Sequence, residues 1–159
     1  MKHTLLITTA LIITALMLVF GCSNDGVITE YYENGQKRSE VTYKDGKEDG
    51  KWTRWHENGQ KSGEGTYKSY ENKYQLSELD GLYTNWYENG QKSAEGTMKD
   101  GEYDGKYTSW YENGQKKMEG TYKDGEEIGS TRWEYYSNGQ KKSETTYKDG
   151  KFFKETIWD

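Results

Sequence analysis

The sequence has few of the residues from which proteins build catalytic and metal sites. It contains one cysteine, Cys22, so no disulfide can form within the chain. Only two histidines are present, His3 and His56, and no group of histidines and cysteines has the spacing of a metal site. No pattern ties a nucleophilic serine to His56. We therefore predict a protein that is not an enzyme and needs no metal ion or cofactor.

Basic charge and aliphatic residues are also scarce. The formal net charge is −5 at pH 7, which disfavours nucleic acid as a partner because a polyanion selects a basic surface. Hydrophobic residues make up 31% of the chain and charged residues another 31%, a balance that is typical of disorder. Aromatic residues nevertheless reach 15%, with 15 Tyr and 6 Trp. Since each ring carries a large apolar area, this composition favours a folded chain with an aromatic core.

The start of the chain has the layout of a secretory signal peptide. Lys2 precedes an uncharged run from Leu5 to Phe20, and Gly21 follows directly before Cys22. The run is shorter than the roughly 20 residues that a membrane-spanning helix needs, although an uncleaved anchor helix is the alternative interpretation. A lone cysteine in an exported protein requires an explanation, and lipid attachment supplies one.

The segment Val19-Phe20-Gly21-Cys22 resembles the lipobox of bacterial lipoproteins. The resemblance implies that residues 1–21 are removed, that Cys22 receives lipid, and that residues 22–24 form a short tether at the membrane. In that family, aspartate after the cysteine often retains the protein at the inner membrane, whereas here Ser23 follows. The resemblance therefore predicts a lipid-anchored protein of the cell envelope, at the outer membrane if the organism has one.

Residues 25–159 contain one pattern five times: two rings, Glu-Asn-Gly-Gln-Lys, a variable stretch and Thr-Tyr-Lys-Asp-Gly, with small variations. The turn asparagines follow one another at intervals of 24, 31, 24 and 25 residues: Asn34, Asn58, Asn89, Asn113 and Asn138. A period in this range indicates a repeat architecture. Asn-Gly between alternating strand formers predicts a β-hairpin with a two-residue type I′ turn, and the Asp-Gly stretches supply the return turns.

The pattern predicts an all-β fold, an elongated open antiparallel meander of repeated β-hairpins that follows the signal-peptide helix. A terminal strand is expected at residues 152–158. Pairing outward from the Asn-Gly turns places a large ring opposite a glycine in three hairpins: Trp52 and Gly65, Tyr83 and Gly96, and Tyr107 and Gly120. A ring can cover the gap that a glycine leaves in a sheet. Because one hairpin is not stable alone, the stack is the folding unit.

Alternation along the strands divides the rings between two faces. One face gathers most of them and is the predicted core. The other face keeps one ring per hairpin among Thr, Glu and Lys: Tyr31, Trp55, Trp86, Trp110 and Tyr135. Exposed apolar groups often mark contact sites, so this series is the candidate binding surface for a protein or a glycan. The alternative interpretation is that these rings also belong to the core of a thin sheet.

Other candidate residues have simpler interpretations. His56 stands where the other hairpins have tyrosine, so we interpret it as a substituted ring. Acidic residues near the return turns could suggest Ca²⁺, but Asp-Gly is ordinary turn chemistry and the EF-hand spacing is absent: Asp45, Glu48, Asp49, Asp100 and Asp104. Residues 69–80 break the period and predict a loop, which either carries specificity or is an inert bulge.

One glutamate also recurs in every repeat. These carboxylates could be read as acids and bases of an active site, but their periodic recurrence favours cross-strand pairing with Lys and Thr: Glu40, Glu64, Glu95, Glu119 and Glu144.

From Asp25 to Asp159 the hairpin pattern resembles the MORN repeat variant. The matching features are the Asp-Gly-x-x-x-Gly-Lys opening, as at residues 45–53, and the Tyr-Glu-Asn-Gly-Gln-Lys turn, as at residues 111–116. The departures are the insert at 69–80 and the segment Ser130-Thr131-Arg132-Trp133. The resemblance implies elongated hairpin sheets with interaction roles and no fixed catalytic residues.

Bacterial proteins with this repeat are often labelled antitoxins of a toxin–antitoxin family. An intracellular toxin needs a cytosolic partner, whereas Cys22 indicates export. The leading hypothesis is therefore a membrane-anchored protein-interaction or structural module of the envelope. The alternatives are a carbohydrate- or peptidoglycan-binding module that uses the surface tryptophans, and an antitoxin-like protein. The sequence names neither the partner nor the oligomeric state.

Overall fold

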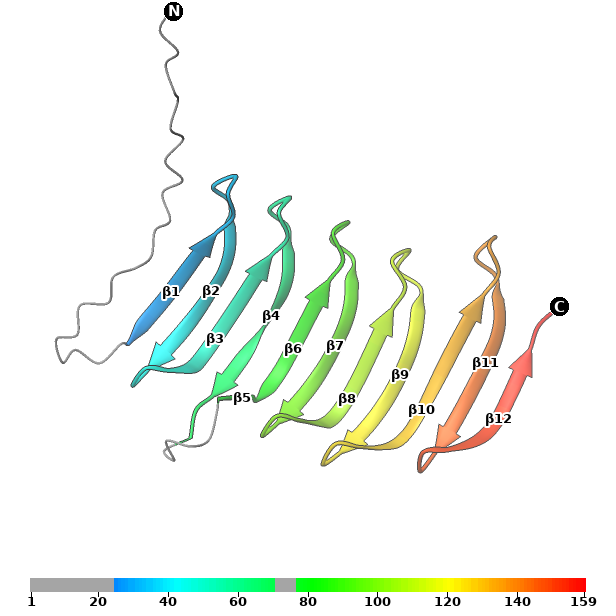
Figure 1. Ribbon diagram of the computed structural model, residues 1–159. Helices are drawn as coiled ribbons and strands as arrows, with labels where there is room; N and C mark the ends of the chain where they lie inside the picture. The colour runs from blue at the N-terminus through cyan, green and yellow to red at the C-terminus, as the bar shows by residue number, and fades with distance from the viewer. Residues whose placement is uncertain (1–24, 71–76) are drawn as a thin grey trace, which may run out of the picture.

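The computed structural model describes residues 25–70 and 77–159, and these form a single antiparallel sheet (Figure 1). Its strands are β1 (Gly26–Tyr31), β2 (Lys37–Lys44), β3 (Lys47–Trp55), β4 (Lys61–Lys68), β5 (Glu78–Leu79), β6 (Gly81–Trp86), β7 (Lys92–Lys99), β8 (Glu102–Trp110), β9 (Lys116–Lys123), β10 (Glu126–Tyr135), β11 (Lys141–Lys148) and β12 (Lys151–Ile157). Eleven strands follow one another as a meander, and β5 pairs with β4 beside that path. The predicted open all-β meander is confirmed, and β12 is the predicted terminal strand. The predicted signal-peptide helix and Cys22 lie outside the described residues.

The Asn-Gly turns differ from the predicted type I′ geometry. In the hairpin of β6 and β7, Gly90 N donates to Tyr87 O at 2.9 Å, and Tyr87 N donates to Gln91 O at 2.9 Å. The loop therefore has three residues, and within it only Gly90 has a positive φ, of 82°. The asparagine uses its side chain instead, because Asn89 Oδ1 accepts the N–H of Gln91 at 2.9 Å. This bond favours a type I turn followed by a left-handed glycine.

The type I′ turns are the Asp-Gly return turns. Asp100 and Gly101 have φ values of 48° and 81°, and the residues on either side, Lys99 and Glu102, pair directly. Asp45, Asp124 and Asp149 have the same left-handed backbone. Aspartate tolerates this conformation better than most side chains do, which is why Asp-Gly can close a two-residue hairpin.

The core lies on one face of the sheet and consists mainly of rings. Val41, Trp52 and Tyr83 are buried. The partly buried side chains packed against them come from β2 and from four further strands: Tyr43, Tyr67, Leu79, Met98 and Tyr103. No side chain of the described residues is completely buried, so the aromatic core is one layer thick.

Glycines opposite these rings allow the rings to lie flat on the backbone. All three predicted ring–glycine pairings are confirmed as register partners. A Cβ atom on Gly65 would lie 2.9 Å from Trp52 Nε1, and one on Gly96 would lie 2.9 Å from Tyr83 Cε1. The prediction that Tyr107 covers Gly120 is wrong. Tyr122 and Ser130 are the side chains closest to that glycine, and the Tyr107 ring leans over Gly96.

One described end of the insert at 69–80 is part of the sheet, at residues 78 and 79. In β5, Leu79 pairs with Tyr67 and Glu78 pairs with Lys68. Leu79 also packs against the buried core. The prediction of a loop over residues 69–80 is therefore wrong for residues 78 and 79, because the apolar side chain of Leu79 gains contact with the rings.

Candidate interaction surface

A row of alternating threonine and glutamate crosses the face opposite the core. At its centre Thr84 pairs with Glu64 on one side and Glu95 on the other, and only 5% of Thr84 is exposed. The row consists of Thr29, Glu40, Thr53, Glu64, Thr84, Glu95, Thr108, Glu119 and Thr131. The predicted cross-strand pairing of glutamate with threonine is thus confirmed for all five glutamates. Glu144 pairs with Thr156 on one side and with Trp133, in place of a second threonine, on the other.

Each recurring glutamate forms an ion pair with a lysine three residues before it on the same strand, so the prediction of cross-strand pairing with lysine is wrong. Lys61 Nζ lies 2.7 Å from Glu64 Oε2, with about half of the lysine side chain exposed. The same pair recurs in every hairpin: Lys37–Glu40, Lys92–Glu95, Lys116–Glu119 and Lys141–Glu144. Exposed pairs of this kind contribute little to stability. Their main effect is to place an ammonium and a carboxylate side by side in each repeat.

These lysines also lie over tryptophan rings of the following hairpin. Lys61 Nζ is 5.9 Å from the centroid of Trp86, and Lys92 Nζ is 5.9 Å from that of Trp110. The remaining contacts are Lys37 with Trp55 at 5.7 Å, Lys116 with Trp133 at 5.9 Å and Lys141 with Trp158 at 5.5 Å. These distances fall within the range of a cation–π contact. We call the five rings Trp55, Trp86, Trp110, Trp133 and Trp158 the tryptophan ladder.

A hydrogen bond from the preceding hairpin holds the backbone at each ladder residue. The Tyr32 hydroxyl donates to Trp55 O at 2.7 Å. Three further tyrosine hydroxyls make the equivalent bond to the next ladder carbonyl: Tyr87 to Trp110, Tyr111 to Trp133 and Tyr136 to Trp158. His56 takes the place of tyrosine, with Nε2 2.9 Å from Trp86 O. Since a carbonyl only accepts, Nε2 carries a hydrogen and acts as the donor. The geometry matches the interpretation of His56 as a substituted ring.

The ladder differs from the predicted series at both ends. Trp55, Trp86 and Trp110 are members, each half-buried. Tyr31 is 60% exposed, and no lysine of the described residues lies over its ring. Tyr135 is not a member either. It meets Tyr111 edge-on, with ring centroids 6.0 Å apart, at a cavity of about 680 Å³.

An altered register in β10 explains why the predicted series of rings does not include Trp133. Trp110 lies three residues before Asn113, whereas Trp133 lies five before Asn138, so counting back from the turn points to Tyr135. The register shift between Glu127 and Gly129 sets Thr131 against Glu119 and brings Trp133 two residues later into the ladder. Counting two residues forward from Thr131 and from Thr156 would have found Trp133 and Trp158.

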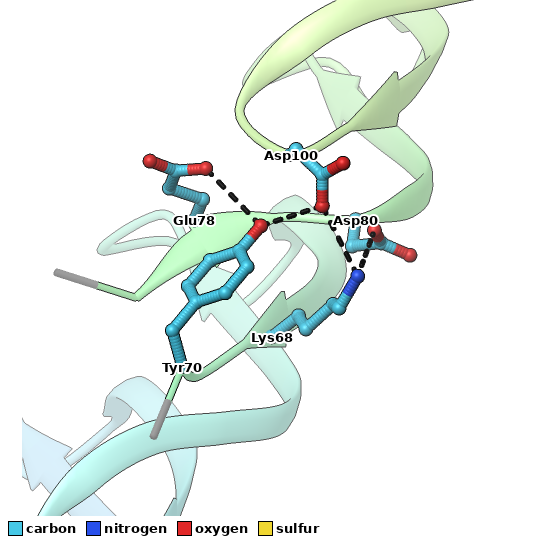
Figure 2. Close-up of polar contacts among 5 residues, drawn as sticks. All are labelled: Lys68, Tyr70, Glu78, Asp80 and Asp100. Atoms are coloured by element: carbon cyan, nitrogen blue, oxygen red, sulfur yellow. Dashed lines mark hydrogen bonds and ion pairs between the residues drawn. The ribbon is translucent and has the colours of Figure 1, made fainter. Parts of the chain in front are cut away.

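A polar cluster joins the described ends of the insert to the return turn between β7 and β8 (Figure 2). The Tyr70 hydroxyl donates to Asp100 Oδ1 at 2.6 Å and lies 3.3 Å from Glu78 Oε2. Lys68 Nζ lies 3.1 Å from Asp100 and 3.6 Å from Asp80. Hydrogen bonds from Tyr70 and Lys68 hold the pKa of Asp100 below its ordinary value. The cluster ties the insert to the next return turn.

Two of the acidic residues named for the return turns form ion pairs with lysines. Asp104 forms an ion pair with Lys123 at 2.6 Å, and Asp100 pairs with Lys68. Within residues 25–70 and 77–159, no group of three or more His, Cys, Asp or Glu side chains is arranged to hold a metal ion.

Five segments match the family model of the MORN repeat variant: residues 24–45, 48–69, 79–100, 103–124 and 134–149. The chain belongs to the MORN repeat variant family. Each matched MORN segment contains one Asn-Gly turn, and the longer unmatched stretches hold the insert and the altered register of β10. No curated protein matches the chain. A crystal structure of a protein of unknown function from Bacteroides fragilis NCTC 9343 is similar at 12% identity over 85% of this chain and 94% of that one, but its TM-score is 0.17, too low to support an argument.

The MORN hairpins account for nearly all of the described chain, and no helix in that part is long and apolar enough to cross a membrane.

Proposed function

We propose that this protein is a lipid-anchored scaffold of the cell envelope that binds an extended partner along the tryptophan ladder and catalyses no reaction. The observation that supports this function best is the repetition of one Trp–Lys–Glu unit in successive hairpins. An active site needs one set of convergent groups with different roles. A stack of equivalent units instead suits a partner that contacts several repeats at once.

The anchoring part of the proposal rests on the sequence around Cys22. The uncharged run from Leu5 to Phe20 and the lipobox-like ending support export and lipid attachment. β1 begins at Gly26, so only a few residues would separate the lipid from the sheet. Several acyl chains would hold the scaffold at the membrane surface, since each buried CH₂ contributes about 0.8 kcal/mol.

Metabolic labelling with palmitate and membrane fractionation test the anchor in the producing organism. The wild-type protein should carry label and sediment with membranes. Cys22→Ser should lose both properties, whereas Ser23→Ala, the matched control, should retain label. Equal labelling of Cys22→Ser and the wild type would reject the assignment. A full-length, unlabelled protein in the cytosol would instead favour the antitoxin-like role.

A further inference from the structure

We infer that the tryptophan ladder binds a linear, uncharged polysaccharide that lies across the strands, with about one disaccharide per hairpin. This inference deepens the proposed function, because it assumes that the ladder is the binding surface. The hairpins stand side by side along the sheet, so the ladder runs across the strands (Figure 1). A bound chain would therefore contact successive repeats in the same way.

The ladder rings are fixed platforms, and the polar edge is free in three of them. The tyrosine or histidine bond to each ladder carbonyl fixes the backbone under the ring. The indole N–H of Trp133 donates to Glu144 at 2.8 Å. The indole N–H groups of Trp55, Trp86 and Trp110 have no protein acceptor within the described parts of the chain. A flat apolar face with a hydrogen-bond donor at its edge matches a sugar ring, which is apolar on its faces and carries hydroxyls around its rim.

The groups beside each ring select for hydroxyls. An ammonium only donates and a carboxylate only accepts, so the Lys61–Glu64 pair beside Trp86 offers both functions. A sugar hydroxyl both donates and accepts, and can satisfy either partner. Proline-rich segments also dock on aromatic grooves. Proline, however, lacks a backbone N–H, so such a segment offers the glutamates fewer hydrogen-bond donors than a sugar chain does.

The balance of charge favours an uncharged polymer. Every ladder lysine is paired with a glutamate, so the row carries no net charge per unit. An anionic polymer would face the glutamates, and a cationic one would face the lysines. The lysines are no barrier to a sugar, because about half of each side chain is exposed and a surface cation–π contact contributes only about 0.5–1 kcal/mol.

The spacing of the units favours a polymer over a single sugar. Equivalent residues of successive hairpins lie two strands apart, about 9.6 Å at the usual strand separation. This is close to the length of one disaccharide in an extended β-linked chain. Each unit alone offers one partly exposed ring and gives weak binding. Several units on one chain raise the affinity through effective concentration.

Titration of the purified full-length lipoprotein in detergent with neutral β-1,4-linked oligosaccharides tests the inference. The probes are glucose and N-acetylglucosamine oligomers of two, four and six sugars, followed by tryptophan fluorescence and calorimetry. We expect affinity to rise roughly tenfold or more from disaccharide to hexasaccharide. The double variant Trp86→Ala/Trp110→Ala should lose at least about tenfold of the hexasaccharide affinity. Tyr31→Ala, an exposed ring outside the ladder, should bind as the wild type does.

If Trp86→Ala/Trp110→Ala does not fold, Lys61→Ala/Glu64→Ala tests the inference instead, because removing an exposed ion pair leaves the core intact. That variant should bind the hexasaccharide roughly threefold more weakly, and unchanged affinity would overturn the inference. So would an affinity independent of chain length, or no binding of any neutral oligomer.

A proline-rich peptide and heparin serve as competing probes. Binding of either one in place of the neutral oligomers, with loss in Trp86→Ala/Trp110→Ala, would overturn the glycan assignment and keep the ladder as a binding surface. If neither these probes nor the oligomers bind, the ladder part of the proposed function fails as well, whereas the palmitate experiment decides the anchor independently.

Discussion

Tyr83 and Trp86 lie three residues apart on β6 and are covered in different ways. Only 8% of Tyr83 is exposed, because its ring lies on Gly96 and its hydroxyl is 3.0 Å from that of Tyr103. Trp86 is half-buried beneath Lys61, a side chain that is itself about half exposed. A ring that rests on backbone and other rings can leave only if the sheet deforms. A ring under a lysine is uncovered by a change of rotamer.

The largest expected effect is the loss of a core ring. Tyr83→Ala should lower the free energy of unfolding by about 3–5 kcal/mol, because it removes buried apolar area and leaves a gap over Gly96. Trp86→Ala should cost clearly less, about 1–2 kcal/mol, since a half-buried ring has less area to lose. Denaturant unfolding of both variants measures the difference. Equal or greater destabilisation by Trp86→Ala would show that the ladder is structural packing.

Adding volume to the core face should have a smaller effect. A Cβ on Gly96 would lie 2.9 Å from Tyr83 Cε1 and 3.2 Å from Tyr107 Cδ2, so Gly96→Ala should cost about 1–3 kcal/mol through overpacking. Lys92→Ala, on the ladder side of the same strand, is the matched control. It removes one exposed ion pair and one cation–π contact and should cost less than about 1 kcal/mol. Similar unfolding midpoints for the two variants would contradict the distinction between the faces.

Much of the fold could be predicted because the repeat leaves few choices. Five copies of one pattern with strict alternation define the strands, their antiparallel order and the two faces. The exchange of turn types was not predictable from the dipeptides alone, since both Asn-Gly and Asp-Gly can form a type I′ turn. The side-chain bond from Asn89 Oδ1 to the Gln91 N–H decides the difference, and it depends on the residue after the glycine.

The ladder could be predicted only where the register is regular. Trp55, Trp86 and Trp110 keep one distance from their turns, and the structure places all three together. Trp133 escapes this count because of the shift in β10, and Trp158 because no turn follows it in the sequence. The lysines that lie over the ladder rings could not be predicted, because each contact joins two different hairpins, as between Lys61 and Trp86. Pairing of strands within one hairpin does not reveal such contacts.

High pH should weaken the core face selectively. Burial, followed by the charge of Glu127, raises the pKa of Tyr122 to about 12 from its ordinary value of 10.0. The folded state therefore disfavours the ionised ring. This stabilisation is fully present below pH 10 and is lost as the pH rises from 10 towards 12. Unfolding midpoints between pH 9 and pH 12 should fall for the wild type and for Trp86→Ala alike, and less steeply for Tyr122→Phe. An equally steep fall in Tyr122→Phe would exclude this tyrosine as a source.

The smallest expected effect concerns the backbone beneath the ladder. His56 Nε2 donates to Trp86 O at 2.9 Å, the bond that a tyrosine hydroxyl makes in the other hairpins. His56→Tyr should keep this bond and change the free energy of unfolding by less than about 0.5 kcal/mol. His56→Phe retains a ring but has no donor, and should cost about 1 kcal/mol because the Trp86 carbonyl loses its partner. Denaturant unfolding of the two variants in parallel isolates the hydrogen bond from the packing of the ring. If His56→Tyr and His56→Phe prove equally stable, the bond contributes nothing measurable, and the ladder face is held by strand pairing alone.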